Sequence, residues 1–215
     1  MNNIHAVIFD MDGLLMDSEG LGVEGIRESA RLQGVEIPAE IVRRCIGITA
    51  KASSDLYHTF WPHLDTDRLF RDFLSIMHEK ALRGEIPLKK GAMPLLQYLQ
   101  AAGIPAAVAS SSRMETIRTY LDSVQVTGFF RELISASGIP SKPAPDVFLL
   151  AAERLGVKPA ECLVLEDSYN GVKAGRAAGM QVCMVPDQLP YTEELSPFVD
   201  HVLPDLNAVM ELMKK

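Results

Sequence analysis

The chain has 215 residues, of which 47% are hydrophobic and 23% are charged, values typical of a globular enzyme and not of a disordered or fibrous chain. This length suits one large domain or a domain with a modest insertion. The formal net charge of −7 disfavours a broad surface for nucleic acid or anionic membranes, so any anionic ligand would need a local positive centre.

The first predicted element is a short buried strand over residues 6–9, an apolar run of Ala, Val, Ile and Phe. This strand ends on Asp10 and Asp12, which Gly13 follows. Because side chains alternate along a strand, both carboxylates could project toward one side of its carboxyl end. Open α/β sheets bind ligands beyond that end. Two carboxylates there repel each other unless a cation or a shared proton intervenes, so the pattern indicates a metal site or a nucleophile with an acid/base partner.

Residues 17–85 show helical patterning with few strand-like runs. In the clearest stretch, apolar residues recur at three- and four-residue steps, as on one helix face: Phe70, Phe73, Leu74, Met77 and Ala81. We therefore expect residues 1–16 and 86–215 to form a core domain. Residues 17–85 would form an inserted helical domain, with connecting segments near 14–18 and 83–90.

From Gly91 onward, strand-like runs alternate with helical stretches. The predicted strands are residues 104–110, 132–137, 161–167, 180–185 and 200–203, and the predicted helices are residues 91–102, 113–123, 144–155 and 168–178. Alternation of this kind predicts an α/β fold in which a doubly wound parallel sheet is covered by helices on both faces.

Two local patterns concern helix ends and helix faces. Ser112 and Glu115 have the spacing of a capping box before the helix predicted at 113–123. Gly171, Gly175 and Gly179 recur every four residues, so we expect them to form a small-residue face that packs close to the sheet.

The sequence also bears on the cellular location of the chain. No basic segment precedes the first apolar run, so no secretory signal is expected, and no stretch approaches the roughly 18 apolar residues of a membrane span. The three cysteines, Cys45, Cys162 and Cys183, lack C-x-x-C spacing. Reduced thiols in a cytoplasmic protein are the simplest account.

Four segments carry a resemblance to a known family. The sequence "FDMDGLLMDSE" matches D-x-D-G-[TVL]-[LI]-x-D-[ST], the first motif of the haloacid dehalogenase-like (HAD) hydrolases. "AVASSS", "SKPAPD" and "LVLEDSYNG" match that family's second, third and fourth motifs, in the family's order. The chain therefore resembles a HAD phosphatase over essentially its whole length, in the branch of β-phosphoglucomutase-like enzymes and sugar phosphatases with a helical cap. The inserted helical domain corresponds to that cap.

The resemblance implies roles for the acidic residues. Asp10 would be the nucleophile that forms an aspartyl-phosphate, and Asp12 would be the general acid/base. The expected cofactor is Mg²⁺, with Asp10, the backbone carbonyl of Asp12 and Asp167 as protein ligands. Glu166 would bind the metal directly or support a ligand.

The resemblance also implies residues that bind the phosphoryl group and the substrate. Ser110 would donate a hydrogen bond to a phosphoryl oxygen, helped by backbone N–H groups around Ser111 at the start of a helix. Lys142 would neutralise charge on the nucleophile and on the transferring group. In the cap, the segment "IGITAKAS" (46–53) is similar to a loop that reaches the substrate, which makes Lys51 a candidate substrate contact.

We therefore expect a Mg²⁺-dependent phosphatase of small phosphorylated metabolites, such as sugar or polyol phosphates, that acts as a cytoplasmic monomer without nucleic-acid or membrane partners. The alternative is a β-phosphoglucomutase-type phosphomutase. That branch places a His where Gly22 stands and an Arg near Ala50, so the departures favour water as the final acceptor. A dehalogenase is disfavoured because that branch lacks the residue equivalent to Asp12. A nonenzymatic phosphate-binding protein should have lost a nucleophile or a metal ligand, and none is missing.

Overall fold

The computed structural model describes residues 4–214, which divide into two compact units. The first unit comprises the chain up to Asp17 and from Pro87 onward, and the second runs from Ser18 to Ile86. The second unit thus begins and ends one residue later than the predicted insertion of residues 17–85.

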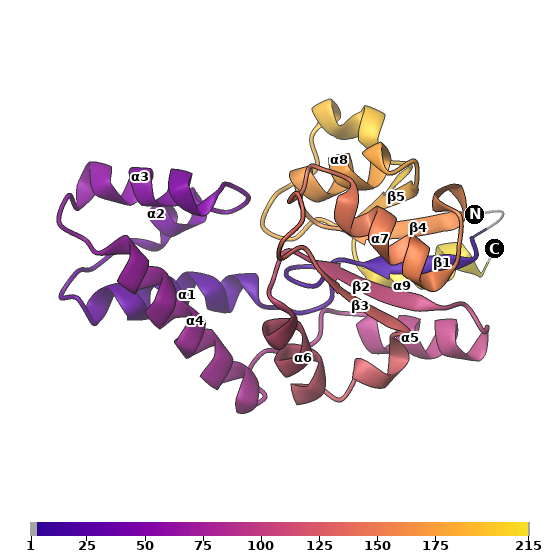
Figure 1. The fold of residues 1–215 in the computed structure, drawn as a ribbon, viewed down its shortest axis with the longest axis horizontal. Helices are drawn as coiled ribbons and strands as arrows, with labels where there is room; N and C mark the ends of the chain where they lie inside the picture. The colour runs from indigo at the N-terminus through magenta and orange to yellow at the C-terminus, as the bar shows by residue number, and fades with distance from the viewer. Residues whose placement is uncertain (1–3, 215) are drawn as a thin grey trace. The chain divides into compact units, whose positions relative to one another are not determined.

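Within the described residues, the first unit contains a six-stranded parallel sheet with the order β3-β2-β1-β4-β5-β6 (Figure 1). Its strands are β1 (Ala6–Phe9), β2 (Ala106–Ser110), β3 (Glu132–Ser135), β4 (Cys162–Glu166), β5 (Gln181–Met184) and β6 (His201–Val202). All residues of β1, β2 and β4 are buried, as expected for parallel strands covered on both faces.

Helices cover both faces of this sheet, which confirms the doubly wound α/β fold (Figure 1). They are α5 (Ala92–Ala101), α6 (Met114–Ser123), α7 (Asp146–Leu155), α8 (Tyr169–Ala177) and α9 (Leu206–Met213), with short 3-10 helices η1 (Thr127–Phe129), η2 (Pro159–Glu161) and η3 (Glu193–Phe198). The predicted strands and helices between residues 91 and 203 are present, with ends within two residues of those expected. The sequence reasoning missed α9, although Asp205 caps it by accepting a hydrogen bond from the Ala208 N–H.

Strand register gathers the strand ends at one edge of the sheet. Phe9 of β1 pairs with Val108 of β2 and with Leu165 of β4, and the ladder continues as the Asp10 N–H donates to the Leu165 carbonyl. Asp10 therefore lies beside Glu166, the last residue of β4. This placement depends on β1 being the neighbour of β4, although 152 residues separate Asp10 from the start of β4 at Cys162.

The chain leaves and re-enters the first unit through two paired segments. Met16 forms an antiparallel bridge with Leu88, and the Asp17 N–H donates to the Pro87 carbonyl at 2.8 Å. The Lys89 side chain donates to Asp187 at 2.7 Å and lies 3.4 Å from Asp17. The two connections are thus held together by both backbone and side-chain contacts.

The second unit is helical, with α1 (Glu19–Arg31), α2 (Ala39–Arg43), α3 (Ala50–Phe60) and α4 (Thr66–Leu82). Its core includes Ile26, Tyr57 and Leu69. The prediction that Leu74 lies on the apolar face of α4 is wrong, because Leu74 is 49% exposed while Met77 and Ala81 are buried. Leu69, Met77 and Ala81 are buried, and the predicted Phe70 and Phe73 are partly buried against the same unit's core. Among residues 4–214, no helix is long and apolar enough to span a membrane.

Candidate active site

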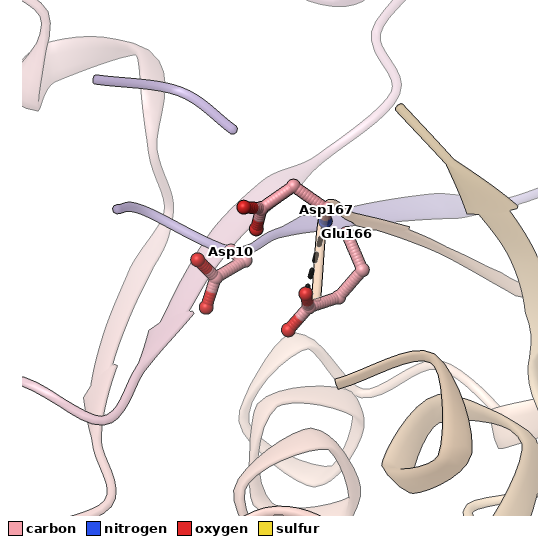
Figure 2. A group of neighbouring side chains, drawn as sticks. All are labelled: Asp10, Glu166 and Asp167. Carbon is pink, nitrogen blue, oxygen red and sulfur yellow. Dashed lines mark hydrogen bonds between the residues drawn. The ribbon is translucent and has the colours of Figure 1, made fainter. Parts of the chain in front are cut away.

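Three acidic side chains meet at the carboxyl edge of the sheet (Figure 2). Asp10 follows β1, Glu166 ends β4 and Asp167 follows it. One carboxylate oxygen from each lies within 4.8 Å of the others, and the residues are only 8%, 0% and 4% exposed. Carboxylates do not gather in a buried place unless cations or hydrogen-bond donors compensate them.

Lys142, from the loop between β3 and α7, supplies a positive charge and hydrogen-bond donors to these carboxylates. Its side chain is 6% exposed, and its ammonium donates to Asp10, to Glu166 Oε1 at 2.7 Å and to the Ala109 carbonyl at 3.1 Å. A lysine ammonium has three hydrogens, so these three acceptors use all of them. The Phe148 ring, 4.7 Å from Nζ, fixes the lysine from one side.

Burial and charge set the protonation of this pair. Burial raises the pKa of Asp10 to about 8; the charge of Lys142 opposes the rise, and those of Glu166 and Asp12 add to it. Burial alone would lower the pKa of Lys142, but the charges of Asp10 and Glu166 outweigh burial and raise it, so the ammonium stays charged. Among residues 4–214, the site therefore holds the fixed positive charge of Lys142 and an excess of acidic groups.

The Glu166 carboxylate is held by several hydrogen-bond donors. Besides Lys142, its carboxylate accepts from the backbone N–H groups of Asp167 and Ser168, both at 3.0 Å, and from Ser168 Oγ at 2.9 Å. Figure 2 shows this side chain folding back toward the backbone of Asp167, while the carboxylates of Asp10 and Asp167 lie beside each other. Because its oxygens already have these donors, Glu166 fits the role of supporting residue better than that of direct metal ligand.

Gly171 makes room for the Glu166 carboxylate. A Cβ at this position of α8 would lie 1.7 Å from Glu166 Oε1 and 1.9 Å from Cδ. Of the three glycines predicted to pack close to the sheet, Gly175 does so, against Val164 and Val182. Gly171 instead faces a carboxylate, and a Cβ at Gly179 would meet nothing within 4 Å.

We expect Gly171→Ala to lower both activity and stability, because the added methyl group must displace a carboxylate that four donors hold. The loss of stability should be about 1–3 kcal/mol. Gly20→Ala in α1 is the matched control, since its Cβ would meet nothing within 4 Å. Removing that helical glycine should stabilise the protein by about 0.5–1 kcal/mol. Thermal unfolding of both variants measures the contrast, and equal shifts would contradict the assigned role of Gly171.

The serines of the second motif lie beside this cluster. Ser110 ends β2, is 1% exposed and accepts a hydrogen bond from the Ser112 N–H at 3.0 Å, so its hydroxyl keeps its own hydrogen to donate. Ser111 is exposed. The predicted capping box is wrong: α6 begins at Met114 after Arg113, without a side-chain cap. The Ser112 hydroxyl instead donates to Asp12 Oδ2 at 3.0 Å.

Asp12 is half-buried, and its carboxylate is not part of the group formed by Asp10, Glu166 and Asp167. Its carboxylate lies toward β2, where Ser112 contacts it. Asp12 therefore remains a candidate metal ligand through its backbone carbonyl alone, and its side chain is available for a different task from that of Asp10.

Lys51 belongs to the second unit. Thr49 accepts a hydrogen bond from the Ala52 N–H and starts α3, so Lys51 lies in the first turn of a helix and not on the expected loop. Its side chain is 84% exposed and pairs with Asp55 at 2.8 Å. The hydrogen bond that Lys51 donates to Asp55 raises the pKa of Lys51, and the charge of Asp55 adds to this. A substrate anion would have to compete with Asp55 for this ammonium.

The acidic cluster suits a hard divalent cation. Three carboxylates supply oxygen, which Mg²⁺ and Ca²⁺ prefer, and no His or Cys takes part in this group among the described residues. Two of the acids, Asp10 and Asp167, come from neighbouring strands that hold their backbones rigidly. The donor set therefore fits a metal ion bound by these two side chains, with Glu166 behind them.

Comparison with known proteins agrees with this arrangement. Residues 7–185 match the model of the haloacid dehalogenase-like hydrolases, and the chain belongs to this family. A Drosophila melanogaster protein named as a probable pseudouridine-5′-phosphatase is 35% identical over 84% of this chain and 80% of its own length. Hexitol phosphatase B of Escherichia coli is 32% identical over 85% of this chain and 84% of its own. The chain is a phosphoric monoester hydrolase.

A solved structure extends the likeness to the fold. CbbY from Rhodobacter sphaeroides, in complex with phosphate, is 25% identical and aligns with a TM-score of 0.79, covering 94% of this chain and 95% of that one. The family resemblance inferred from the four motifs is thus confirmed.

Sequence reasoning missed two residues near the site. It assigned Ser112 to a helix cap, and it placed Gly171 on a face that packs against the sheet. Nothing in the local pattern around Ser112 separates the two uses of its hydroxyl. Nor does the four-residue spacing of the glycines show that Gly171 faces a carboxylate, because that contact depends on where Glu166 lies in the fold.

Proposed function

We propose that this protein is a Mg²⁺-dependent phosphatase of small sugar or polyol phosphates that works through an aspartyl-phosphate on Asp10. The observation that carries the proposal is the convergence of Asp10, Asp167 and Lys142 at the carboxyl edge of the sheet. A buried nucleophilic carboxylate, a cation site and a fixed ammonium are the groups that phosphoryl transfer from an ester requires.

In the first step, a carboxylate oxygen of Asp10 attacks phosphorus, and the bond from phosphorus to the ester oxygen breaks. Asp12 gives its proton to the departing oxygen, which leaves as an alcohol. In the second step, water attacks phosphorus while Asp12 takes a proton from that water. The bond between phosphorus and Asp10 then breaks, which releases phosphate and restores the Asp10 carboxylate.

Two further residues stabilise charge during these steps. Lys142 contacts Asp10 and keeps its positive charge, so it lowers the repulsion between the nucleophile and an anionic phosphoryl group. Ser110 can donate its hydroxyl hydrogen to a phosphoryl oxygen, with the exposed Ser111 next to it at the approach to α6. A Mg²⁺ ion held by Asp10, Asp167 and the Asp12 carbonyl would supply the remaining positive charge.

Water is the acceptor that the chain's residues favour. The mutase branch uses a His and an Arg from its cap, at positions that correspond to Gly22 and Ala50 here. Gly22 lies on α1 and Ala50 is the first residue of α3, so neither position supplies an imidazole or a guanidinium group. Among the relatives, the names of hexitol phosphatase B and of the pseudouridine-5′-phosphatase both denote hydrolysis of a phosphate ester on a sugar or polyol.

The proposal includes a reducing, cytoplasmic setting and a monomeric state. All three cysteines are free. Burial raises the pKa of Cys162 to about 11 and that of Cys183 to about 12, so both thiols stay protonated near neutral pH. Such thiols are structural and unreactive.

A phosphate-release assay over sugar, polyol and nucleotide phosphates tests this function. We expect turnover of sugar or polyol phosphates with Mg²⁺ and a loss of at least about 100-fold after chelation, restored by excess Mg²⁺, because binding by a few carboxylates and water is reversible. In a second arm, β-glucose 1-phosphate should yield free phosphate. Turnover that withstands chelation would contradict the metal site, and formation of glucose 6-phosphate would contradict water as acceptor.

A further inference from the structure

The Ser112 hydroxyl lies at a helix start but does not cap the helix. The cap position of α6 is occupied by Arg113, which makes no side-chain cap, and Ser112 lies one residue before it. Its hydroxyl donates instead to Oδ2 of Asp12, a residue 100 positions earlier in the chain, at 3.0 Å. The Ser112 hydroxyl therefore fixes one carboxylate oxygen of Asp12 and not a backbone group of the helix that follows it.

Each polar group of Ser112 is fixed by a different partner. Its N–H donates to Ser110 Oγ at 3.0 Å, and its carbonyl accepts from Ser135 Oγ at 2.7 Å. The Ser135 hydroxyl in turn accepts from the Ser137 N–H at 3.2 Å. Three adjacent strands, β1, β2 and β3, therefore contribute to one chain of hydrogen bonds that ends on Asp12.

From this geometry we infer that Ser112 is a positioning residue that orients Asp12 for proton transfer; the inference rests on the proposed function. A hydroxyl that donates to Oδ2 leaves the proton of the neutral carboxyl group on the other oxygen, Oδ1. Ser112 thus fixes which oxygen gives the proton to the departing ester oxygen as the phosphorus–oxygen bond breaks. The same oxygen takes the proton from water in the second step.

The consequence depends on the leaving group. A strongly basic alkoxide, as from glycerol phosphate, must be protonated as it leaves, whereas p-nitrophenolate leaves readily without a proton. Disorienting Asp12 should therefore slow alkyl phosphates more than aryl phosphates. It should lower kcat with little change in KM, because the proton is transferred in the transition state and not in the bound ground state.

The experiment compares Ser112→Ala with wild type on glycerol phosphate and p-nitrophenyl phosphate in the presence of Mg²⁺. We expect kcat/KM for glycerol phosphate to fall at least about tenfold more than that for p-nitrophenyl phosphate. Ser112→Thr, which keeps the hydroxyl, should restore most of the difference. Ser29→Ala is the matched control, because it removes a serine hydroxyl that donates at 2.7 Å to a backbone carbonyl, that of Leu69, within the second unit.

Ser135→Ala gives a second route to the same question if Ser112→Ala folds poorly. It removes the anchor of the Ser112 carbonyl and should produce a smaller loss with the same dependence on the leaving group. Equal losses on both esters, or none, in variants that melt like wild type would overturn the inference. The proposed function would still stand in that case, since it fails only if the wild-type protein itself releases no phosphate or if Asp10 is dispensable.

Discussion

Asp10→Asn is expected to lower kcat at least about a thousandfold on every phosphate ester that the wild-type protein hydrolyses. Asparagine has nearly the same shape but is a poor nucleophile, so no aspartyl-phosphate can form. The variant should still bind phosphate esters, because Lys142 and Ser110 remain. The measurement is phosphate release under saturating Mg²⁺, with Asp67→Asn, an exposed acid on α4, as the matched control.

The difference in stability between Asp10→Asn and the wild-type protein should depend on pH. The pKa of Asp10 is about 8 in the folded chain against an ordinary value of 3.8, because of burial. The folded state thus holds this proton more tightly than the unfolded state does, and stability falls as pH rises from the lower value through the higher one. Asparagine has no such proton. Relative to wild type, Asp10→Asn should therefore become more stable as the pH rises.

Thermal unfolding in the presence of chelator, at about pH 6 and about pH 9, measures this difference. The melting temperature of Asp10→Asn minus that of wild type should increase between the two conditions. A decrease would mean that ionised Asp10 stabilises the fold through Lys142 more than its burial opposes ionisation. Undiminished turnover would remove Asp10 from the mechanism altogether.

Lys142→Met is expected to have the second largest effect, because it removes an ammonium that contacts both Asp10 and Glu166. Glu166 is 0% exposed and would keep its backbone and Ser168 donors without a positive partner. Breaking a buried ion pair from one side costs about 3–5 kcal/mol. Turnover should fall by about 10²–10³, as when one donor to developing charge is removed.

Measuring Mg²⁺ binding distinguishes a loss of charge stabilisation from a loss of the folded site. Removal of a positive charge beside the three acids should leave the affinity for Mg²⁺ unchanged or tighter, whereas an unfolded site would lose it. Calorimetric titration with Mg²⁺ below the melting temperature tests this point. Lys158→Met, an exposed lysine before η2, is the control and should change neither property. A Lys142→Met protein with normal kcat would contradict the assignment of Lys142 to charge stabilisation.

Local patterns predicted much of the fold. Continuous apolar runs and helical stretches of period 3.6 depend on neighbours in the chain, so the strands and helices after Gly91 could be placed within two residues. The strand-end acids Asp10, Glu166 and Asp167 could be named for the same reason, and the order of the four motifs identified the family.

Contacts between distant segments could not be predicted in this way. That Lys142 would give one hydrogen to each of Asp10, Glu166 and the Ala109 carbonyl depends on how a loop folds over three strands. The spacing of Ser112 and Glu115 predicted a helix cap, but α6 begins after Arg113 and the Ser112 hydroxyl donates to Asp12. Gly171 leaves the space that the carboxylate of Glu166, from the preceding strand, occupies. The sequence by itself determined which residues carry charge and which segments are strands or helices, because those properties are local. Only the tertiary structure decided which groups meet, because strand order and burial join residues that lie far apart in the chain.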